Sequence, residues 1–91
     1  MLKLVYSSQF KKDFKKFRKL PLEDLKDIFQ VITKLEARQI LESKHRDHEL
    51  VGNWLGFREC HIKSDLLLIY RTTESELQLA RLGSHSELFK K

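Results

Sequence analysis

The chain has 91 residues, the length of a single domain with one modest hydrophobic core. Apolar residues make up 41% of it and charged residues 34%, as in soluble globular domains. It has no apolar run of the roughly 18 residues that a membrane span requires, no signal-peptide pattern, and a single cysteine. We therefore expect a cytoplasmic protein without a membrane contact or an internal disulfide. The net charge of +5 permits a polyanionic partner.

The first third of the chain predicts a strand followed by two helices. Residues 1–6 alternate in polarity and favour a strand, after which Ser7 or Ser8 offers a hydroxyl that can cap a helix. Pro21 suits the first turn of a second helix, whose apolar spacing continues to about Arg38. The apolar face of the first helix is formed by Phe10, Phe14 and Phe17. Two apolar stripes joined by a short link predict a helical hairpin lying on a sheet.

The first helix also carries a dense set of basic side chains, and Asp13 is the only acidic residue before Leu20. Such a set is commonly just a solvated face, but its density also fits a surface that binds a polyanion. The candidate contacts to such a polyanion are Lys11, Lys12, Lys15, Lys16 and Lys19.

The rest of the chain predicts a small sheet. A polar connection over residues 39–53 comes first, and residues 66–70 are apolar without alternation, which indicates a central strand buried on both faces. We expect strands at residues 54–62, 65–72 and 76–83. A short turn follows Gly83. The predicted fold is a single α+β domain over residues 1–91, with an N-terminal strand, a two-helix hairpin and a mainly antiparallel sheet of about four strands.

The lengths of the two turns set which residues share a face of this sheet. If residues 62–64 form the first turn, His61 pairs with Asp65, and if residues 73–75 form the second, Leu67 pairs with Arg81. A two-residue first turn would instead place His61 and Asp65 on opposite faces. On the first reading, the face with these four residues has an apolar floor of Phe57, Ile69, Leu77 and Leu79. The face toward the helices then holds Cys60, Leu66, Leu68, Tyr70, Ala80 and Leu82.

One motif covers residues 47–65: D-H-x-L-x-G-x-W-x-G-x-R-x-x-H-I-x-x-D. It is followed by L-L-L-I-Y and by R-L-G-S-H-S-E-L-F. Together these blocks resemble the YafQ-like branch of the RelE toxin superfamily, and the resemblance extends over nearly the whole chain. Two positions depart from the pattern: Leu66 stands where some relatives have an aromatic residue, and Ser64 where many have proline.

The resemblance implies a RelE-like fold and a bacterial toxin of a type II toxin–antitoxin pair that cuts mRNA on the ribosome. It implies a cognate antitoxin as partner in a hetero-oligomer, mRNA and the ribosome as targets, and no cofactor. The catalytic positions of the family fall on His48, His61, Asp65, Arg81 and His85. Phe89 stands at the aromatic position that contacts RNA.

These residue types suit RNA cleavage without a metal. The reaction needs a base for the 2′-OH, an acid for the leaving 5′-oxygen and a cation at the phosphorane. An imidazole can take either proton role near neutral pH. We expect His85 to be the acid and Arg81 to bind the phosphate, whereas His48, His61 and Asp65 all remain candidates for the base.

Other interpretations stay open at this stage. Arg81 could be held in an ion pair with Asp65 or Glu59 for purely structural reasons. A zinc site is not expected, because His45 and His48 lie on a loop and the Cys60 and His61 side chains point to opposite faces. Strand parity also directs Cys60 to the core, away from a nucleophilic role. The alternative function is a non-catalytic toxin of the same superfamily that binds DNA gyrase.

Overall fold

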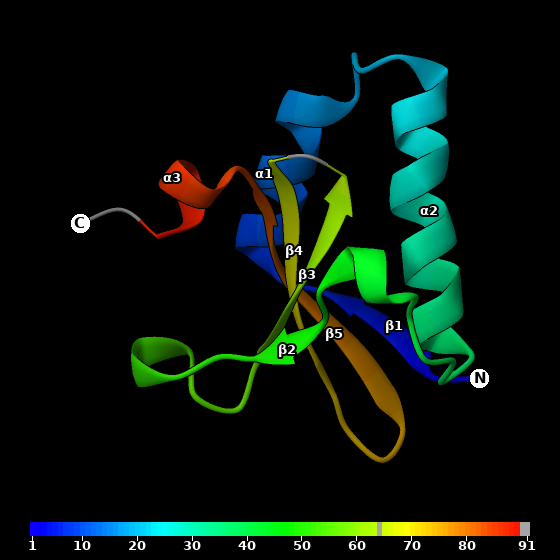
Figure 1. Ribbon diagram of the computed structural model, residues 1–91, viewed down its shortest axis with the longest axis vertical. Coiled ribbons are helices and arrows are strands. Elements are labelled where there is room, and N and C mark those ends of the chain that lie inside the picture. The colour runs from blue at the N-terminus through cyan, green and yellow to red at the C-terminus, as the bar shows by residue number, and fades with distance from the viewer. Residues whose placement is uncertain (64, 90–91) are drawn as a thin grey trace.

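The computed structural model describes residues 1–63 and 65–89. A first strand is followed by two long helices, then by a region with two short 3-10 turns and a short strand, and finally by three consecutive strands and a short helix (Figure 1). In chain order they are β1 (Lys3–Tyr6), α1 (Ser8–Phe17), α2 (Leu22–Glu36), η1 (Ser43–His45), β2 (His48–Glu49), η2 (Gly52–Trp54), β3 (Arg58–Lys63), β4 (Leu66–Thr72), β5 (Glu76–Gly83) and α3 (His85–Leu88).

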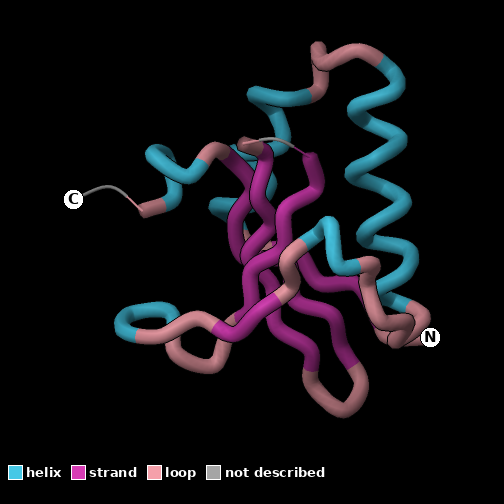
Figure 2. The backbone as a smooth tube through the Cα atoms, in the orientation of Figure 1, coloured by secondary structure: helices cyan, strands magenta, loops and turns pink. Residues whose placement is uncertain are grey.

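The sheet has five strands in the order β1-β5-β4-β3-β2 (Figure 2). The first strand, β1, runs parallel to β5, and the other neighbours are antiparallel. The predicted α+β class is confirmed, with one strand more than expected. The added strand is β2, which lies in the stretch predicted to be a polar loop. No helix within residues 1–63 and 65–89 combines the length and the hydropathy that a membrane crossing needs.

The first long helix begins where the sequence predicts, and the second begins one residue after the Pro21 that was predicted for its first turn. The Ser7 hydroxyl accepts a hydrogen bond of 2.8 Å from the Phe10 N–H, which caps α1. Pro21 stands directly before Leu22, and Glu23 and Asp24 lie in the first turn of α2, near the positive end of its dipole. The second helix ends at Glu36, slightly before the expected Arg38, which adopts a left-handed conformation with φ of 59°.

The sheet has an apolar cluster on each face. The larger cluster lies between the sheet and the helices α1 and α2, and it includes Leu66, Leu68 and Tyr70 of β4. The smaller cluster is built on Leu67 and Ile69 of the same strand. Segments far from β4 in sequence cover this second face: Leu88 of α3, Phe89, and the β2–β3 connection with Leu50, Trp54 and Phe57. In Figure 1, α2 and α3 accordingly lie to opposite sides of the sheet.

The predicted strand at residues 54–62 begins too early. Residues 52–54 form η2, and β3 starts at Arg58. Gly52 and Gly56 have φ of 69° and 94°, a left-handed region that glycine adopts without strain. These two glycines allow the chain to fold back over the sheet face before β3 starts.

The predicted pairing of His61 with Asp65 is wrong. His61 pairs with Leu67 of β4, and the register shifts between His61 and Lys63. Asp65 precedes β4, which starts at Leu66. The displacement from the expected register is two residues, so His61 and Leu67 still share a face.

The predicted register between β4 and β5 is also wrong, for two separate reasons. Thr73 donates its N–H to the Glu76 carbonyl at 2.8 Å, so the turn holds two residues and Leu77 pairs with Thr72. A bulge then inserts Ala80, after which Arg81 pairs with Ile69. Consequently Leu77 and Leu79 face the helices, contrary to prediction. Ala80 packs in the second cluster instead of against the helices, also contrary to prediction.

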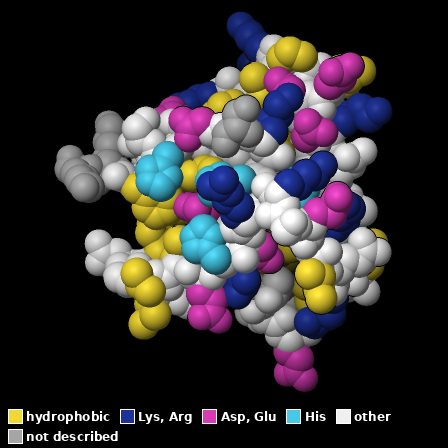
Figure 3. Space-filling model, in the orientation of Figure 1, with side chains coloured by type: hydrophobic (Ala, Val, Ile, Leu, Met, Phe, Trp, Pro, Cys, Tyr) yellow, Lys and Arg dark blue, Asp and Glu magenta, His cyan; other side chains and the backbone are white. Residues whose placement is uncertain are grey.

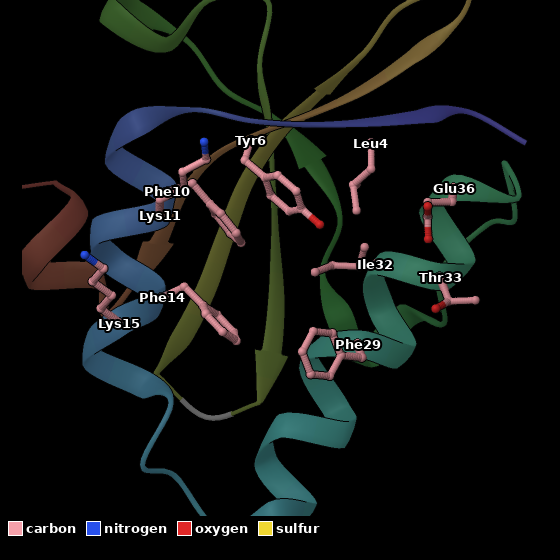
Figure 4. Close-up of a pocket in the computed structure, with 10 residues that line it drawn as sticks. All are labelled: Leu4, Tyr6, Phe10, Lys11, Phe14, Lys15, Phe29, Ile32, Thr33 and Glu36. Atoms are coloured by element: carbon pink, nitrogen blue, oxygen red, sulfur yellow. The ribbon is translucent and has the colours of Figure 1, made fainter.

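An apolar groove of about 520 Å³ opens between α1, α2 and β1. Figure 4 shows its walls: Tyr6, Phe10 and Phe14 on one side, and Phe29 and Ile32 on the other. Lys11 and Lys15 stand at its rim on α1. This groove is on the helical side of the sheet, away from the second cluster.

Candidate active site

Predicted site residues on β2, β3 and β5 lie in two neighbouring rows of directly paired residues that run across the sheet. His48 pairs with Glu59, Glu59 with Ile69, and Ile69 with Arg81, which forms one row across β2, β3, β4 and β5. His61, Leu67 and Gly83 form the next row. At about 4.8 Å between strands, the first row spans about 14 Å from His48 to Arg81. A polar site is therefore spread around the apolar floor of Leu67 and Ile69.

A buried carboxylate joins two of the histidines. Glu59 is only 3% exposed, and its Oε1 lies 3.5 Å from His48 Nε2 and 3.4 Å from His61 Nε2. Charged side chains are rarely this buried without partners, so the two rings account for its position. Glu59 was not predicted from the sequence as a site residue. The sequence did offer one indication: Glu59 stands two residues before His61 on the predicted strand, so both side chains point to the same face.

The two rings are held differently. His48 Nδ1 lies 2.6 Å from the carbonyl oxygen of Arg46, and because a carbonyl only accepts, this nitrogen carries the proton. The His48 side chain is half exposed, whereas that of His61 is 25% exposed. Both present Nε2 to the same carboxylate.

The backbone before His48 is anchored on the opposite face of the sheet. Asp47 Oδ1 accepts hydrogen bonds from the Tyr70 hydroxyl at 2.6 Å and from Arg58 Nε at 3.1 Å. Burial raises the pKa of the Tyr70 hydroxyl and the Asp47 bond raises it further, so the hydroxyl keeps its proton and donates. Neighbouring residues of an extended chain point to opposite faces. Fixing Asp47 on the helical face therefore directs His48 to the face with Glu59.

Asp65 anchors the histidine of the C-terminal turn. Its Oδ1 accepts the backbone N–H of His85 at 3.0 Å, and Ser84 caps α3 in a reciprocal capping box with Glu87. These Ser84 hydrogen bonds lower the pKa of the Glu87 carboxyl. The His85 ring lies 5.0 Å from the Phe89 ring, measured between centroids. Asp65 thus positions His85 through the backbone, and the pairing predicted for it with His61 does not form.

Arg81 is held by a residue that was not predicted as its partner. Arg81 Nε donates to Asp13 Oδ2 at 2.8 Å, and Nη2 donates to Asp13 Oδ1 at 3.3 Å. The ion pair suggested with Asp65 or Glu59 is therefore wrong. Asp13 lies on α1, 68 residues away in sequence, and no local pattern links the two.

The remaining predicted residues lie outside this centre. The five predicted lysines are all exposed, four of them on α1 and Lys19 just after it, and Lys16 Nζ is 4.0 Å from Glu87 Oε2 of α3. Cys60 is fully buried in the larger cluster, and burial raises the pKa of its thiol. In the part of the chain that the structure describes, no three His, Cys, Asp or Glu side chains are grouped to hold a metal ion. Figure 3 shows histidine side chains gathered on one face beside an apolar patch, with basic and acidic groups between them.

The Asp47 anchor makes a stability prediction. Tyr70→Phe removes one donor to a partly buried carboxylate, and we expect a loss of about 1.5–3 kcal/mol in the free energy of unfolding. The matched control is Tyr6→Phe, because Tyr6 is 47% exposed, and it should change stability by less than about 0.5 kcal/mol. Urea denaturation of both variants measures this, and equal stabilities would show that the anchor contributes nothing.

Comparison with known proteins identifies a family and a shared fold. The family model described as "Bacterial toxin of type II toxin-antitoxin system, YafQ" matches residues 2–90. The mRNA interferase toxin YafQ of Escherichia coli K12 is 35% identical over 85 residues, covering 92% of this chain and 91% of that protein. The crystal structure of YafQ from E. coli BL21(DE3) superposes with a TM-score of 0.88 at 32% identity, covering 98% of this chain and 99% of that one. YafQ in the crystal structure of the E. coli DinJ–YafQ toxin–antitoxin complex has a TM-score of 0.82 at 34% identity, covering 97% of each chain. None of these relatives supports gyrase binding.

Proposed function

We propose that this chain, which belongs to the YafQ family of bacterial toxins of type II toxin–antitoxin systems, is an endoribonuclease that cuts mRNA on the ribosome. Its curated E. coli relative is named an mRNA interferase. The observation that carries the proposal is the buried Glu59 carboxylate between His48 and His61. Binding alone gives no reason to place a carboxylate between two imidazoles, whereas proton transfer does.

The reaction needs only groups that these residues supply. The 2′-oxygen loses its proton and forms a bond to phosphorus, while the bond from phosphorus to the 5′-oxygen breaks and that oxygen takes a proton. The products are a 2′,3′-cyclic phosphate and a 5′-hydroxyl. A base, an acid and a cation near the phosphate suffice.

His61 is the base that the geometry favours. If its Nε2 donates to Glu59, its Nδ1 keeps the lone pair that can take a proton, and Glu59 stabilises the resulting imidazolium. His48 has a proton on Nδ1 and also faces Glu59, which suits it to hold positive charge beside the phosphate. Asp65 is engaged with the His85 backbone, which argues against it as the base.

The acid and the phosphate contact lie at the other end of the site. His85 is exposed at the start of α3, where it can reach a leaving oxygen, and Phe89 beside it can stack on a base. Arg81 offers a planar guanidinium to the phosphate. Leu67 and Ile69, which the second apolar cluster covers, lie between these two ends, and the RNA backbone would pass over that cluster.

Glu59→Gln tests the mechanism. The amide keeps the shape of the side chain but removes the charge that stabilises an imidazolium, so we expect mRNA cleavage to slow by about 10²-fold. The matched control is Glu49→Gln, because Glu49 lies on the neighbouring strand β2 and is 84% exposed at its side chain. Cleavage should be mapped on mRNA with and without ribosomes. Normal cleavage by folded Glu59→Gln would refute the assigned role, and no cleavage by the wild type in either setting would refute the function.

The four lysines of α1 and Lys19, which follows it, are proposed to bind ribosomal or messenger RNA phosphates. Reversing Lys12, Lys16 and Lys19 to Glu should weaken ribosome binding, and the slope of log affinity against log salt should fall by about 0.9 for each duplex phosphate that is no longer bound. Lys11 and Lys15 are left unchanged because they line the groove beside α2.

A control with the same change in net charge reverses Lys3, Lys26 and Lys44, which are exposed on other elements. It should keep most of the affinity and the salt slope. If both triple variants behave alike, Lys12, Lys16 and Lys19 form only a solvated surface.

The proposed partner is a cognate antitoxin, as in the E. coli DinJ–YafQ complex. The net charge of +5 favours an acidic segment that folds on binding, and such a segment would either cover the active face or draw the His85 turn away from it. We expect amide exchange of the toxin to change in β3 and α3 on binding. Protection confined to the groove between α1 and α2, with β3 and α3 unaltered, would contradict this mode of inhibition.

A further inference from the structure

Asp13 is the one acidic residue among the lysines of α1, and it is almost fully buried at 2% exposure. Burial alone would raise the pKa of its carboxyl, but hydrogen bonds from Arg81, the Leu82 N–H and Gln9 outweigh burial and lower it. The carboxylate is therefore ionised and fully engaged in a helix whose lysines face solvent. Its bonds run to β5 and to Gln9, one helical turn earlier.

The sheet explains why a carboxylate is needed at this place. The pairing of β1 with β5 reaches only from Glu76 to Leu79, because the chain leaves the sheet at Ser7 to begin α1. Ser7 donates its backbone N–H to the Leu79 carbonyl at 3.0 Å and its hydroxyl to the Ala80 carbonyl at 2.7 Å. Beyond that point β1 no longer borders this edge of β5, and Asp13 Oδ2 accepts the Leu82 N–H at 3.0 Å in place of a strand carbonyl.

We propose that Asp13 is a positioning residue that holds the Arg81 guanidinium in the orientation that receives the phosphate at the cleavage site. This inference rests on the proposed function, in which Arg81 binds that phosphate. It follows from the geometry of the Asp13–Arg81 pair and from the place of Arg81 in the row that contains Glu59.

The pair leaves one edge of the guanidinium available. Asp13 takes the edge formed by Nε and Nη2, at 2.8 and 3.3 Å. The opposite edge, with the outer hydrogens of both terminal nitrogens, has no hydrogen-bond partner among residues 1–63 and 65–89. That edge can bind two phosphate oxygens in a fork, which a lysine cannot copy.

Rigidity gives the pair its effect on the reaction. An exposed arginine loses rotamer freedom when it binds, whereas Arg81 is already held by a buried partner on a packed helix. The Arg81 side chain is 22% exposed, so part of it reaches the surface. A misplacement of about 1 Å can cost about 10²-fold in rate, so the orientation set by Asp13 is worth a comparable factor.

The competing explanation is that Asp13 only closes the edge of β5. Asp13→Asn separates the two explanations, because its amide oxygen can still accept the Leu82 N–H while the charged fork to Arg81 is lost. We expect single-turnover cleavage of ribosome-bound mRNA to slow by about 10²-fold per folded molecule. Asp27→Asn, a change of the same kind on α2 at a side chain that is 43% exposed, should cleave normally.

A double-mutant cycle with Arg81→Lys tests whether Asp13 acts through Arg81. In the Arg81→Lys background, Asp13→Asn should slow cleavage little further, because the fork is already absent. An equal loss in both backgrounds, or a normal rate for Asp13→Asn alone, would overturn the inference and leave Asp13 with a structural role.

A spectroscopic measurement does not depend on cleavage. In ¹⁵N-labelled wild-type protein, the Nε–H of Arg81 should give a signal protected from solvent exchange, and Asp13→Asn should lose it while keeping the backbone amide spectrum. If the wild-type signal is unprotected, the inference fails even if Asp13→Asn does not fold. If the signal is protected and depends on Asp13, but Arg81→Lys cleaves normally, the role of Arg81 in the proposed function has failed.

Discussion

The central strand β4 has two apolar faces, but the two long helices cover only one of them. Leu67 and Ile69 on the other face are fully buried, so other parts of the chain must exclude water from them. The β2–β3 connection does so with Trp54 and Phe57, and the last turn with Leu88. The same segments flank or carry His48 and His85. Hydrophobic burial on the second face therefore brings distant histidines to the sheet, and the polar bonds of Asp47 and Asp65 then set their directions.

Much of the fold was predictable from the sequence, because its signals are local. The Ser7 cap, the phenylalanine stripe and the unbroken apolar run of β4 each act within a few residues. Register was harder, since it depends on single residues in turns. The turn at Glu74–Ser75 and the bulge at Ala80 each displace β5 by one residue, and the two displacements add to two. Arg81 therefore lies on the predicted face although its predicted partner is wrong, whereas Leu77, between the two irregularities, lies on the opposite face.

The carboxylates of the site were harder to predict than its histidines. The resemblance supplied His48, His61 and His85 as candidates, but Glu59 and Asp13 were not placed in the site. The position of Glu59 depends on β2, a two-residue strand too short to leave a pattern in sequence. Asp13 stands among lysines on a helix and meets Arg81 only because β5 lies beside α1 in the folded chain. Buried charges need partners, but the sequence does not say which partner is near.

The parallel pairing of β1 with β5 also bears on when the protein becomes active. Lys3–Tyr6 pair with residues 76–79, which are made much later in the chain. The Asp13 carboxylate likewise binds the N–H of Leu82 on β5, and the turn that carries His85 follows β5 in the chain. Contacts of such long sequence separation form late in folding, and a nascent chain cannot make them until β5 has left the exit tunnel. A nascent chain without β5 would therefore hold His48 and His61 but lack the Arg81 and His85 that complete the proposed site.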